Sequence, residues 1–201
     1  MQKRDGFSVR SALAKDAAVL RNIYAPYVLE KAVSFECALP SVEQFAARIA
    51  STLEMYPYLV AELDGMPVGY ACAHRFQDFA GYDWSVETTI YVKRGFSRRG
   101  IGRRLHAALE ACLKAQGVCS MNACIAHQDF NDELLNDASE RFHAAMGYRQ
   151  VAHFRKIAFV HGRWFDIVWM QKNIGDQSEA PRALTPFPEL GSDELLHAGV
   201  N

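Results

Sequence analysis

Hydrophobic and polar residues alternate along residues 85–92, and a helical period follows shortly after them. The alternating run is rich in β-branched and aromatic side chains, which is typical of a strand. From Gly102 onward apolar residues recur at helical spacing, and this predicts a helix that ends at Gly117. Glu87 is a carboxylate inside the otherwise strand-like run. The two strand faces carry Val86, Thr88, Ile90 and Val92 on one side and Ser85, Glu87, Thr89 and Tyr91 on the other.

The N-terminal part of the chain predicts a short strand and two helices. Residues 7–13 have a strand pattern, and residues 16–29 have helical spacing. Pro26 is expected to bend or end this first helix early, because proline has no N–H to donate. Ser41 and Gln44 form a capping box, which predicts the start of a second helix.

Further strands are predicted on both sides of the central run. The apolar runs 58–63 and 67–74 are joined by Asp64-Gly65, which is a strong hairpin signal. Residues 120–126 predict a strand after the central helix, and the helix has the length that a parallel crossover needs. We therefore expect antiparallel strands followed by one parallel pair.

The C-terminal third predicts a short helix and a last hairpin. Residues 139–146 have helical spacing, and Gly147 is expected to end that helix. The runs 151–159 and 164–171 predict two strands around His161-Gly162-Arg163. Beyond residue 174 the periodic pattern ends and prolines are frequent, which indicates a tail that can lie against its own domain or a neighbour.

Composition fits one soluble domain, which we assign to residues 1–174 with a tail over 175–201. The chain has 201 residues, of which 50% are hydrophobic, so it can bury a sizeable core. A net charge of −1 does not favour nucleic acid or an anionic membrane as a partner. Residues 1–16 lack the apolar core of a signal peptide, and no run approaches transmembrane length. Reduced, buried thiols in the cytoplasm are the simplest interpretation of five cysteines without C-x-x-C spacing, namely Cys37, Cys72, Cys112, Cys119 and Cys124.

A basic, glycine-containing turn at residues 93–102 connects the central strand to its helix. Glycines let an anion approach the main chain, and the first N–H groups of a helix have no internal partner, so a phosphate or pyrophosphate is the natural ligand. The spacing matches neither the P-loop nor the dinucleotide fingerprint. A solvated basic face around an ordinary helix entry is the alternative. The basic side chains that would attract a polyphosphate are Lys93, Arg94, Arg98, Arg99, Arg103 and Arg104.

The turn Arg98-Arg99-Gly100-Ile101-Gly102-Arg103 resembles the acetyl-CoA pyrophosphate loop of GNAT N-acetyltransferases. The preceding residues 82–92 are similar to the corresponding stretch in the branch that contains phosphinothricin and methionine sulfone acetyltransferases. The resemblance covers about residues 7 to 174, in order. Further matches are Val33-Ser34-Phe35-Glu36, Tyr58-Leu59-Val60-Ala61-Glu62, Asn136-Asp137-Ala138-Ser139 and His161-Gly162-Arg163-Trp164-Phe165-Asp166.

This resemblance implies an α+β fold with a mixed, mostly antiparallel central sheet, a parallel strand pair at the acetyl-CoA site and helices on both faces. It also implies acetyl-CoA as co-substrate, no metal, and a homodimer. Asn136 matches a position that hydrogen-bonds the cofactor, although a loop or helix-cap asparagine is the alternative. The residues that the resemblance assigns to acetyl-CoA are Ile90, Tyr91, Val92, Arg98, Arg99, Gly100, Ile101, Gly102, Arg103 and Asn136.

Acetyl transfer to an amine requires a base for the amine and a proton for the departing thiolate. Glu87 is our candidate base, and a structural ion pair with an arginine is its alternative. His143 falls where many relatives place a tyrosine that protonates the thiolate, and Tyr148 is a further candidate for that role. A structural role is the alternative for both side chains. Since no covalent nucleophile is indicated, we expect direct attack in a ternary complex.

The expected acceptor is the α-amino group of a small L-amino acid of the phosphinothricin, methionine sulfone or sulfoximine type. Two positions depart from the family pattern. Ser97 stands where Gln or Arg is usual in the loop, and Phe79 stands where an arginine is common. Phe35 is as readily a core residue as a substrate contact. The residues that the resemblance places near the acceptor are Phe35, Gln77, Asp78, Phe79, Tyr82, Thr88 and Thr89.

Other functions compete with this one. A peptide N-terminus or a polyamine is the alternative acceptor, and a GNAT-like domain that binds CoA without catalysis is the alternative class. A nucleic-acid module would need basic residues spread over a face with aromatics between them, whereas here they are confined to one turn. Residues 127–137 are acidic but lack metal-ligand spacing, so a solvated loop is expected there.

Overall fold

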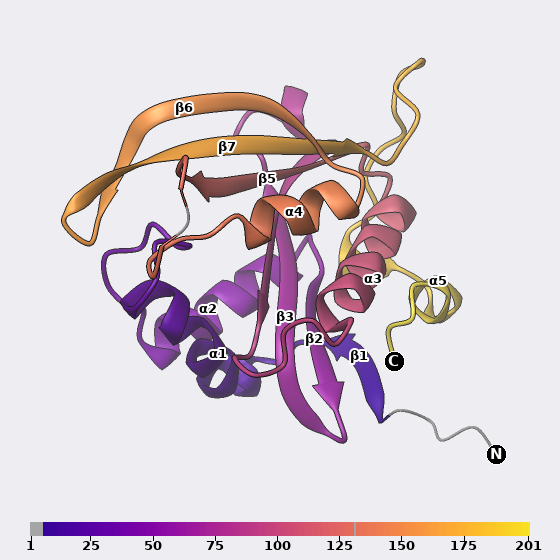
Figure 1. Ribbon diagram of the computed structural model, residues 1–201. Coiled ribbons are helices and arrows are strands. Elements are labelled where there is room, and N and C mark those ends of the chain that lie inside the picture. The colour runs from indigo at the N-terminus through magenta and orange to yellow at the C-terminus, as the bar shows by residue number, and fades with distance from the viewer. Residues whose placement is uncertain (1–5, 131) are drawn as a thin grey trace.

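The computed structural model describes residues 6–130 and 132–201. Within them, seven strands form one sheet in the order β1-β2-β3-β4-β5-β7-β6 (Figure 1). Neighbouring strands are antiparallel except for β4 and β5, which are parallel. The expected mixed sheet is therefore confirmed. The strands are β1 (Phe7–Ser11), β2 (Tyr58–Leu63), β3 (Met66–Arg75), β4 (Ser85–Val92), β5 (Ser120–His127), β6 (Arg149–Val160) and β7 (Arg163–Asn173).

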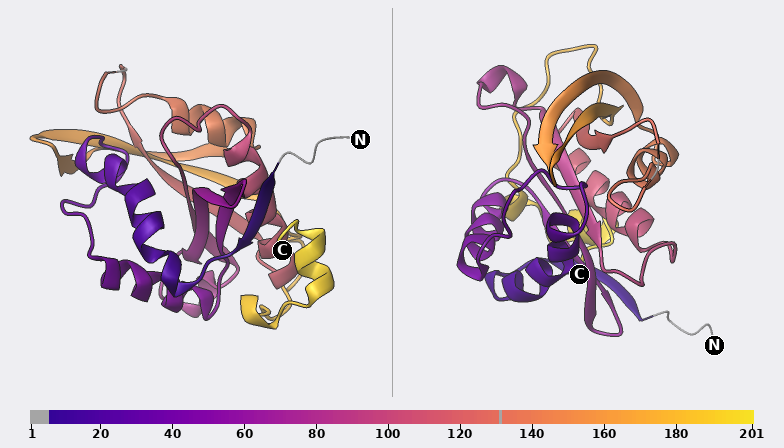
Figure 2. Two further views of the ribbon diagram at one scale, coloured as in Figure 1. Left: turned by 90° about the horizontal axis from the view of Figure 1, so that it is seen from below. Right: turned by 60° about the vertical axis from the view of Figure 1, so that its left-hand side comes forward.

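Helices cover both faces of the sheet (Figure 2). Two of them, α1 and α2, pack on one face, and α3 packs on the other. The helices are α1 (Ala17–Leu29), α2 (Val42–Leu53), α3 (Ile101–Gln116), α4 (Ala138–Ala145) and α5 (Ser192–His197), with short 3₁₀ turns at Ala14–Asp16, Ala80–Tyr82 and Phe187–Glu189.

Alternation along the strands builds a separate core on each face. On β2, Leu59 and Ala61 are buried with the residues of α3, whereas Tyr58 and Val60 are buried with those of α1 and α2. This follows from the period of two in a strand, which sends successive side chains to opposite faces. Residues on both faces of the central strands are therefore mostly apolar, and a polar side chain there needs a structural or functional explanation.

The hairpin between β2 and β3 forms as the sequence predicts. Asp64 and Gly65 both have positive φ, at 52° and 76°, and Leu63 pairs with Met66 on either side of them. Two central residues with positive φ are characteristic of the type I′ turn, whose twist matches that of the strands.

The first helix does not end early at Pro26. It continues to Leu29, with Pro26 inside it, and the Glu30 N–H donates to the Pro26 carbonyl at 3.2 Å. Proline removes one helical hydrogen bond. Tyr24 and Val28, on either side of it, are buried against the sheet, so tertiary packing holds the last turn in place.

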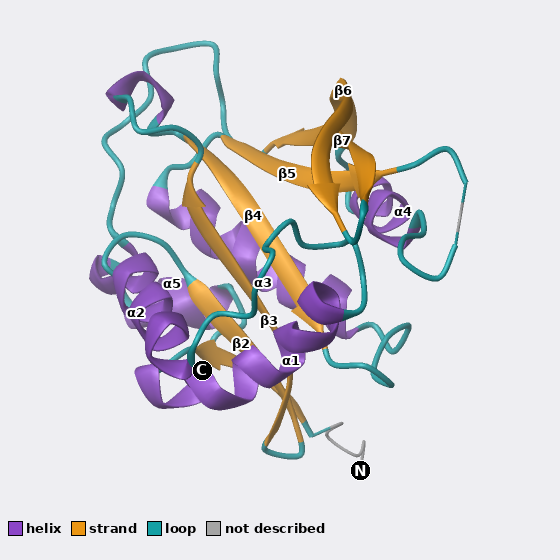
Figure 3. Cartoon of the chain, turned by 90° about the vertical axis from the view of Figure 1, so that its left-hand side faces the viewer, coloured by secondary structure: helices purple, strands orange, loops and turns teal. Residues whose placement is uncertain are grey.

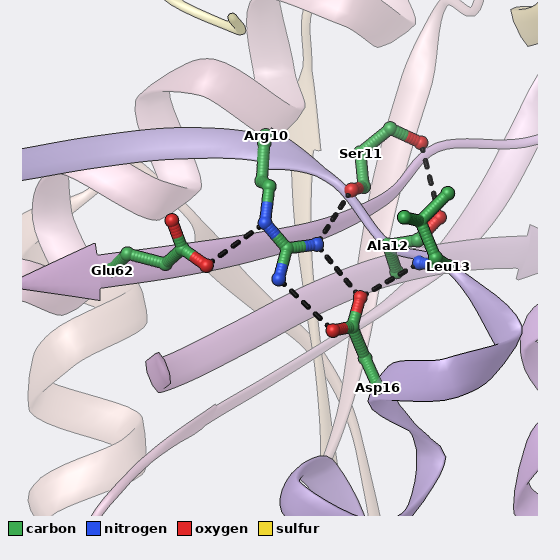
Figure 4. A network of polar contacts seen from close by, with 6 residues as sticks. All are labelled: Arg10, Ser11, Ala12, Leu13, Asp16 and Glu62. Carbon is green, nitrogen blue, oxygen red and sulfur yellow. Dashed lines mark hydrogen bonds and ion pairs between the residues drawn. The ribbon is translucent and has the colours of Figure 1, made fainter. Parts of the chain in front are cut away.

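A polar network joins β1, β2 and the start of α1 (Figure 4). The Arg10 guanidinium donates to both carboxylate oxygens of Asp16, at 2.7 and 2.9 Å, and to Glu62 at 2.9 Å. The Leu13 N–H also donates to Asp16, at 2.8 Å. Burial alone would raise the pKa of Asp16, but Arg10 and the Leu13 amide hold it below its usual value.

Residues 175–201, which we call the C-terminal strap, lie against their own domain, which is one of the two positions that the sequence left open for this tail. They include α5, which the sequence pattern did not predict, and they lie beside α3 (Figure 1). The Gln116 side-chain amide donates to the Thr185 carbonyl at 3.0 Å, and the Asn201 N–H donates to Val9 at 2.9 Å. The strap contributes four buried apolar side chains to the α3-side core: Phe187, Leu190, Ala198 and Val200.

The cysteines are free thiols, but one of them departs from the prediction. Cys37 is exposed in the irregular segment between α1 and α2 and is not buried in a helix or strand. The other four are buried or half-buried. Within residues 6–130 and 132–201, no helix is both long enough and apolar enough to span a bilayer.

Candidate functional site

The parallel strands β4 and β5 separate in the middle of the sheet. Their pairing covers only Ser85 with Ser120, Val86 with Met121 and Glu87 with Asn122. Beyond Glu87 the two strands diverge, as Figure 3 shows. Across the described part of the chain, the rest of β4 therefore forms a ladder with β3 but none with β5. The Val92 carbonyl accepts from the Tyr27 hydroxyl at 2.5 Å, and the other main-chain groups on that edge are available to a ligand.

A buried asparagine stabilises the point where the strands separate. Asn122 Nδ2 donates to the Val86 carbonyl at 3.1 Å, and the Thr88 hydroxyl donates to the Asn122 carbonyl at 3.1 Å. The Gln171 amide donates to Asn122 Oδ1, also at 3.1 Å. Asn122 is not among the site residues predicted from the sequence. The only signal for it was a lone amide in an otherwise apolar run.

The entrance of α3 has the geometry of an anion site. Gly100 precedes the helix with φ of 79°, and the Arg104 N–H donates to the Gly100 carbonyl at 3.1 Å. The amides before Arg104 in this helix therefore have no partner inside it. A Cβ atom on Gly100 would meet nothing within 4 Å, so the space beside it is open. Gly102 is packed instead, since a Cβ there would lie 3.3 Å from Phe142. These features fit a pyrophosphate.

Only part of the basic cluster lies free at this turn. Arg98 and Arg103 are exposed and, within the described residues, form no ion pair; Arg99 is exposed over the Phe96 ring at 5.1 Å. Arg94 instead pairs with Glu30 at 2.7 Å, and Arg104 lies 3.7 Å over the Phe7 ring. Arg94 and Arg104 thus also anchor the turn to α1 and β1.

Glu87 lies on the sheet face that α1 and α2 cover. Its side chain is 27% exposed, and burial raises the pKa of its carboxyl. The basic side chain that contacts it among the described residues is His74, at 3.8 Å, and not the arginine that the alternative interpretation required. Desolvation by the surrounding protein lowers the pKa of His74, although 54% of its side chain is exposed, so near neutral pH this imidazole does not neutralise Glu87.

The predicted acceptor residues do not all gather around Glu87. Thr89 lies on the same strand face as Glu87, but Thr88 is buried on the opposite face, bonded to Asn122. Phe35 packs into a small core cluster with Phe165, which supports its structural interpretation. The loop between β3 and β4 carries the exposed or half-exposed residues Gln77, Asp78, Phe79 and Tyr82, of which Phe79 is 72% exposed.

Both candidate proton donors are buried between α3, α4 and β4. His143 Nδ1 lies 2.8 Å from the Ser139 carbonyl, which can only accept, so this nitrogen carries the proton. The Tyr148 hydroxyl lies 3.0 Å from His106 Nε2 and 3.3 Å from the Thr88 hydroxyl. Burial lowers the pKa of His143, lowers that of His106 to about 4, and raises that of Tyr148.

The loop from β5 to α4 is held by structural contacts. Asn136 Oδ1 accepts from the Ala138 N–H at 3.0 Å, which matches the helix-start alternative for this residue. Asp132 accepts from the amides of Leu134 and Leu135 at 2.8 and 2.9 Å and pairs with Arg163 at 2.6 Å. Among the described residues, no group of three or more His, Cys, Asp or Glu side chains is arranged to hold a metal ion.

A cavity of about 290 Å³ opens on the same sheet face as Glu87. It lies between the central strands and the two N-terminal helices, with His74 at its wall. Most of its residues are not among the predicted site residues, although Tyr70 and Cys72 alternate on one face of β3 and Tyr58 of β2 pairs with Cys72. The lining side chains are Tyr24, Glu36, Phe45, Arg48, Thr52, Tyr58, Tyr70, Cys72, His74, Thr89 and Tyr91.

The sequence and the fold are similar to those of known acetyltransferases. Residues 9–169 match the acetyltransferase (GNAT) domain. A phosphinothricin N-acetyltransferase from Streptomyces viridochromogenes is 30% identical, over 94% of this chain and 98% of its own length. An L-methionine sulfoximine/L-methionine sulfone acetyltransferase from Salmonella typhimurium is also 30% identical, over 88% and 99%. A phosphinothricin acetyltransferase from Sinorhizobium meliloti, solved in complex with acetyl-CoA, has a TM-score of 0.79 at 29% identity and covers 88% of this chain and 94% of its own. The chain therefore belongs to the GNAT family of N-acetyltransferases.

Proposed function

We propose that this chain transfers the acetyl group of acetyl-CoA to the α-amino group of a small L-amino acid of the phosphinothricin, methionine sulfone or methionine sulfoximine type. The observation that carries the proposal is a half-buried carboxylate, Glu87, placed where β4 and β5 separate and beside a cavity of ligand size. The names of the relatives support the acceptor class.

The entrance of α3 would hold the pyrophosphate of acetyl-CoA. The exposed arginines and the unpartnered amides after Gly100 would bind its charge, and the free edge of β4 from Ile90 to Val92 would bind the pantetheine arm. When bound, acetyl-CoA supplies an activated acyl thioester. The position of Asn136 near the start of α4 is consistent with a further contact to the same ligand.

Glu87 would accept a proton from the acceptor ammonium group, which frees the amine to attack. In the transfer the C–N bond forms, the C–S bond breaks, and the leaving thiolate takes up a proton. A carboxyl whose pKa is raised by burial is a better base toward an ammonium group than an exposed one.

His143 and Tyr148 are the two candidates for returning a proton to the thiolate. The proton on His143 Nδ1 is directed at the Ser139 carbonyl, so a neutral His143 has no proton to give from its other nitrogen. Tyr148 keeps its hydroxyl proton at neutral pH and contacts Thr88 of β4. We therefore propose a test in which Tyr148→Phe and His143→Gln are compared. The residue that donates the proton should show the larger loss of kcat with unchanged CoA affinity.

We also propose that the chain acts in the cytoplasm as a homodimer. β6 is an edge strand of the sheet, and sheet edges are sites of association. The β6–β7 hairpin exposes apolar side chains, which favours a covered surface there. They are Val151, Phe154, Ile157, Phe159 and Trp164. Analytical ultracentrifugation of the wild type and of Phe154→Glu tests this state, with a dimer expected only for the former.

An acceptor screen tests the activity itself. CoA release is measured with acetyl-CoA and methionine sulfone, methionine sulfoximine, phosphinothricin, a peptide with a free N-terminus, or spermidine. We expect turnover with at least one of the three amino acids. Glu87→Gln should lose about 10²- to 10⁴-fold in kcat while still binding acetyl-CoA.

Glu62→Gln is the matched control for that variant, because Glu62 is also a partly buried glutamate on a strand, with 18% of its side chain exposed. It should keep its activity in the folded protein. Equal rates for Glu87→Gln and the wild type would remove Glu87 from the reaction. Turnover with the peptide or spermidine alone would replace the proposed acceptor class.

A further inference from the structure

The cavity beside Glu87 is lined at one end by a histidine that contacts this glutamate. His74 Nε2 lies 3.8 Å from Glu87 Oε2, and the two residues are direct cross-strand partners. The next pair on the same face, Cys72 and Thr89, lines the cavity further in. A volume of about 290 Å³ is at the lower end of small-molecule sites. The cavity thus begins where the acceptor amine would lie and continues away from it.

The middle of the cavity is aromatic and uncharged. Tyr58 and Tyr70 stack with ring centroids 5.5 Å apart, and Tyr70 and Tyr91 are also 5.5 Å apart. Burial raises the pKa of Tyr24, Tyr58, Tyr70 and Tyr91, so all four hydroxyls are neutral. Walls of this kind suit an apolar chain.

An ion pair lies at the wall formed by α2. Arg48 donates to the Glu36 carboxylate at 2.5 Å, and the Arg48 side chain is 49% exposed. A guanidinium has five N–H donors, so one such bond leaves others for a ligand. Glu36 balances the charge of Arg48, and burial lowers the pKa of His74 and keeps that ring neutral. The side chains that line the cavity therefore carry no net charge, while Glu87, in contact with His74, adds a negative charge beside it.

These features decide which part of an amino acid enters the cavity. The α-carboxylate is attached to the same carbon as the amine and stays close to Glu87. A group at the end of the side chain can pass the tyrosines and reach Arg48. An anionic group would meet Glu36 and Glu87, whereas a neutral group with acceptor oxygens can accept from Arg48 without that repulsion.

We propose that this cavity binds the acceptor's side chain, with Arg48 donating hydrogen bonds to neutral sulfone- or sulfoximine-type oxygens at its end in preference to an anionic phosphinate. This deepens the proposed function and rests on it. Glu36 is a positioning residue that holds the guanidinium and sets the charge of the site.

The first test compares matched acceptors. Methionine and methionine sulfone differ only in the two oxygens on sulfur. Arg48→Met should lower kcat/KM for methionine sulfone by roughly tenfold to a hundredfold, the worth of a hydrogen bond from a charged donor, and should change kcat/KM for methionine by no more than about threefold. Arg48→Lys keeps the positive charge but loses the planar set of guanidinium donors. Its kcat/KM for methionine sulfone should therefore lie between those of the wild type and Arg48→Met. An equal loss for both acceptors, or none for either, would overturn the proposal.

Lys114→Met is the control for loss of a surface ion pair. Lys114 pairs with Glu110 at 2.8 Å and is 50% exposed, much like Arg48, but it lies on the opposite side of the sheet. Lys114→Met should leave the ratio of kcat/KM for methionine sulfone to kcat/KM for methionine unchanged. A change in that ratio as large as that of Arg48→Met would contradict a local role for Arg48.

Glu36→Gln tests the charge argument. Removing this carboxylate leaves Arg48 unbalanced, so phosphinothricin should gain at least about tenfold in kcat/KM relative to methionine sulfone. An unchanged ratio would overturn the preference for a neutral group.

Calorimetry separates this inference from the proposed function. Methionine sulfone is titrated into the wild type and into Arg48→Met, with CoA present and no acetyl donor. If no amino acid is acetylated but methionine sulfone binds the wild type and not the variant, the proposed function fails and the side-chain site stands. Equal binding to both proteins, or no binding to the wild type, overturns the site.

Discussion

At the scale of single residues, Glu87 is placed where it is poorly solvated. Its carboxyl is partly buried in the sheet, and its partner His74 is uncharged near neutral pH because burial also lowers the pKa of that imidazole. A buried carboxylate without a compensating cation costs free energy in its ionised form. The property that would make Glu87 a useful base in the proposed reaction therefore opposes folding.

The first prediction concerns the pH dependence of the reaction. Glu87 must be ionised to accept a proton, so kcat/KM should rise with pH through a pKa above that of an ordinary glutamate. Below that pKa the carboxyl is protonated and the rate falls. A kcat/KM profile from pH 4.5 to 9 measures this limb. Glu87→Gln should lose the limb, and a profile with the same acid limb in the variant would assign it to another group.

A second prediction concerns stability. The pKa of Glu87 is higher in the folded than in the unfolded chain, so its protonated form stabilises the fold below the unfolded pKa, and this contribution is lost as pH rises through the folded pKa. Glu87→Gln should therefore be more stable than the wild type near pH 7, and the difference should shrink toward pH 4. Denaturant unfolding at both pH values measures it. A variant less stable at pH 7 would show that the carboxylate is well compensated.

At the scale of elements, the entrance of α3 depends on one glycine conformation. Gly100 has a positive φ and open space beside it, so strain and not a clash limits what can replace it. The backbone at Gly100 directs the first amides of the helix. A shift in its φ would therefore move the groups that we assign to the pyrophosphate.

Gly100→Ala tests that dependence. Gly65 is the matched control, since its φ is 76° and a Cβ there also meets nothing within 4 Å, but it lies in the turn between β2 and β3. Each alanine should cost roughly 1–2 kcal/mol of stability through left-handed strain. Only Gly100→Ala should weaken CoA binding in calorimetry. Wild-type affinity in this variant would mean that the turn does not position the ligand.

Elements with local signals could be predicted from the sequence. The alternation along β4, the helical spacing of α3 and the Asp64-Gly65 turn each depend on neighbouring residues, and the structure confirms them. The last turn of α1 could not be predicted, because packing of Tyr24 and Val28 outweighs the effect of Pro26. The cavity could not be predicted either, since its walls come from segments that are distant in the chain.

At the scale of the whole molecule, the C-terminal strap completes the core on the α3 side. Its buried residues are spaced irregularly, so no helical or strand period marked them in the sequence. The sequence indicated where the periodic pattern ends but not that the following residues pack. Contacts with residues far away in the sequence determine that the strap packs. The Phe187 N–H donates to the Met55 carbonyl at 3.0 Å, and Arg182 donates to the carbonyl of Ala115 at the end of α3.

The strap should therefore contribute to stability and not to ligand binding. Phe187 is 6% exposed, so Phe187→Ala should cost about 3–5 kcal/mol, which lowers Tm by roughly 6–20 °C. Leu196 is 62% exposed, and Leu196→Ala is the control, with a change of about 0.5 kcal/mol or less.

The strap holds the C-terminal end of α3, whereas the proposed pyrophosphate site lies at its N-terminal end. Sixteen helical residues separate the two ends by about 24 Å. CoA affinity of Phe187→Ala, measured well below its Tm, should therefore equal that of the wild type. A more than tenfold loss of affinity in the folded variant would mean that packing under the strap determines the position of the whole helix, including its entrance.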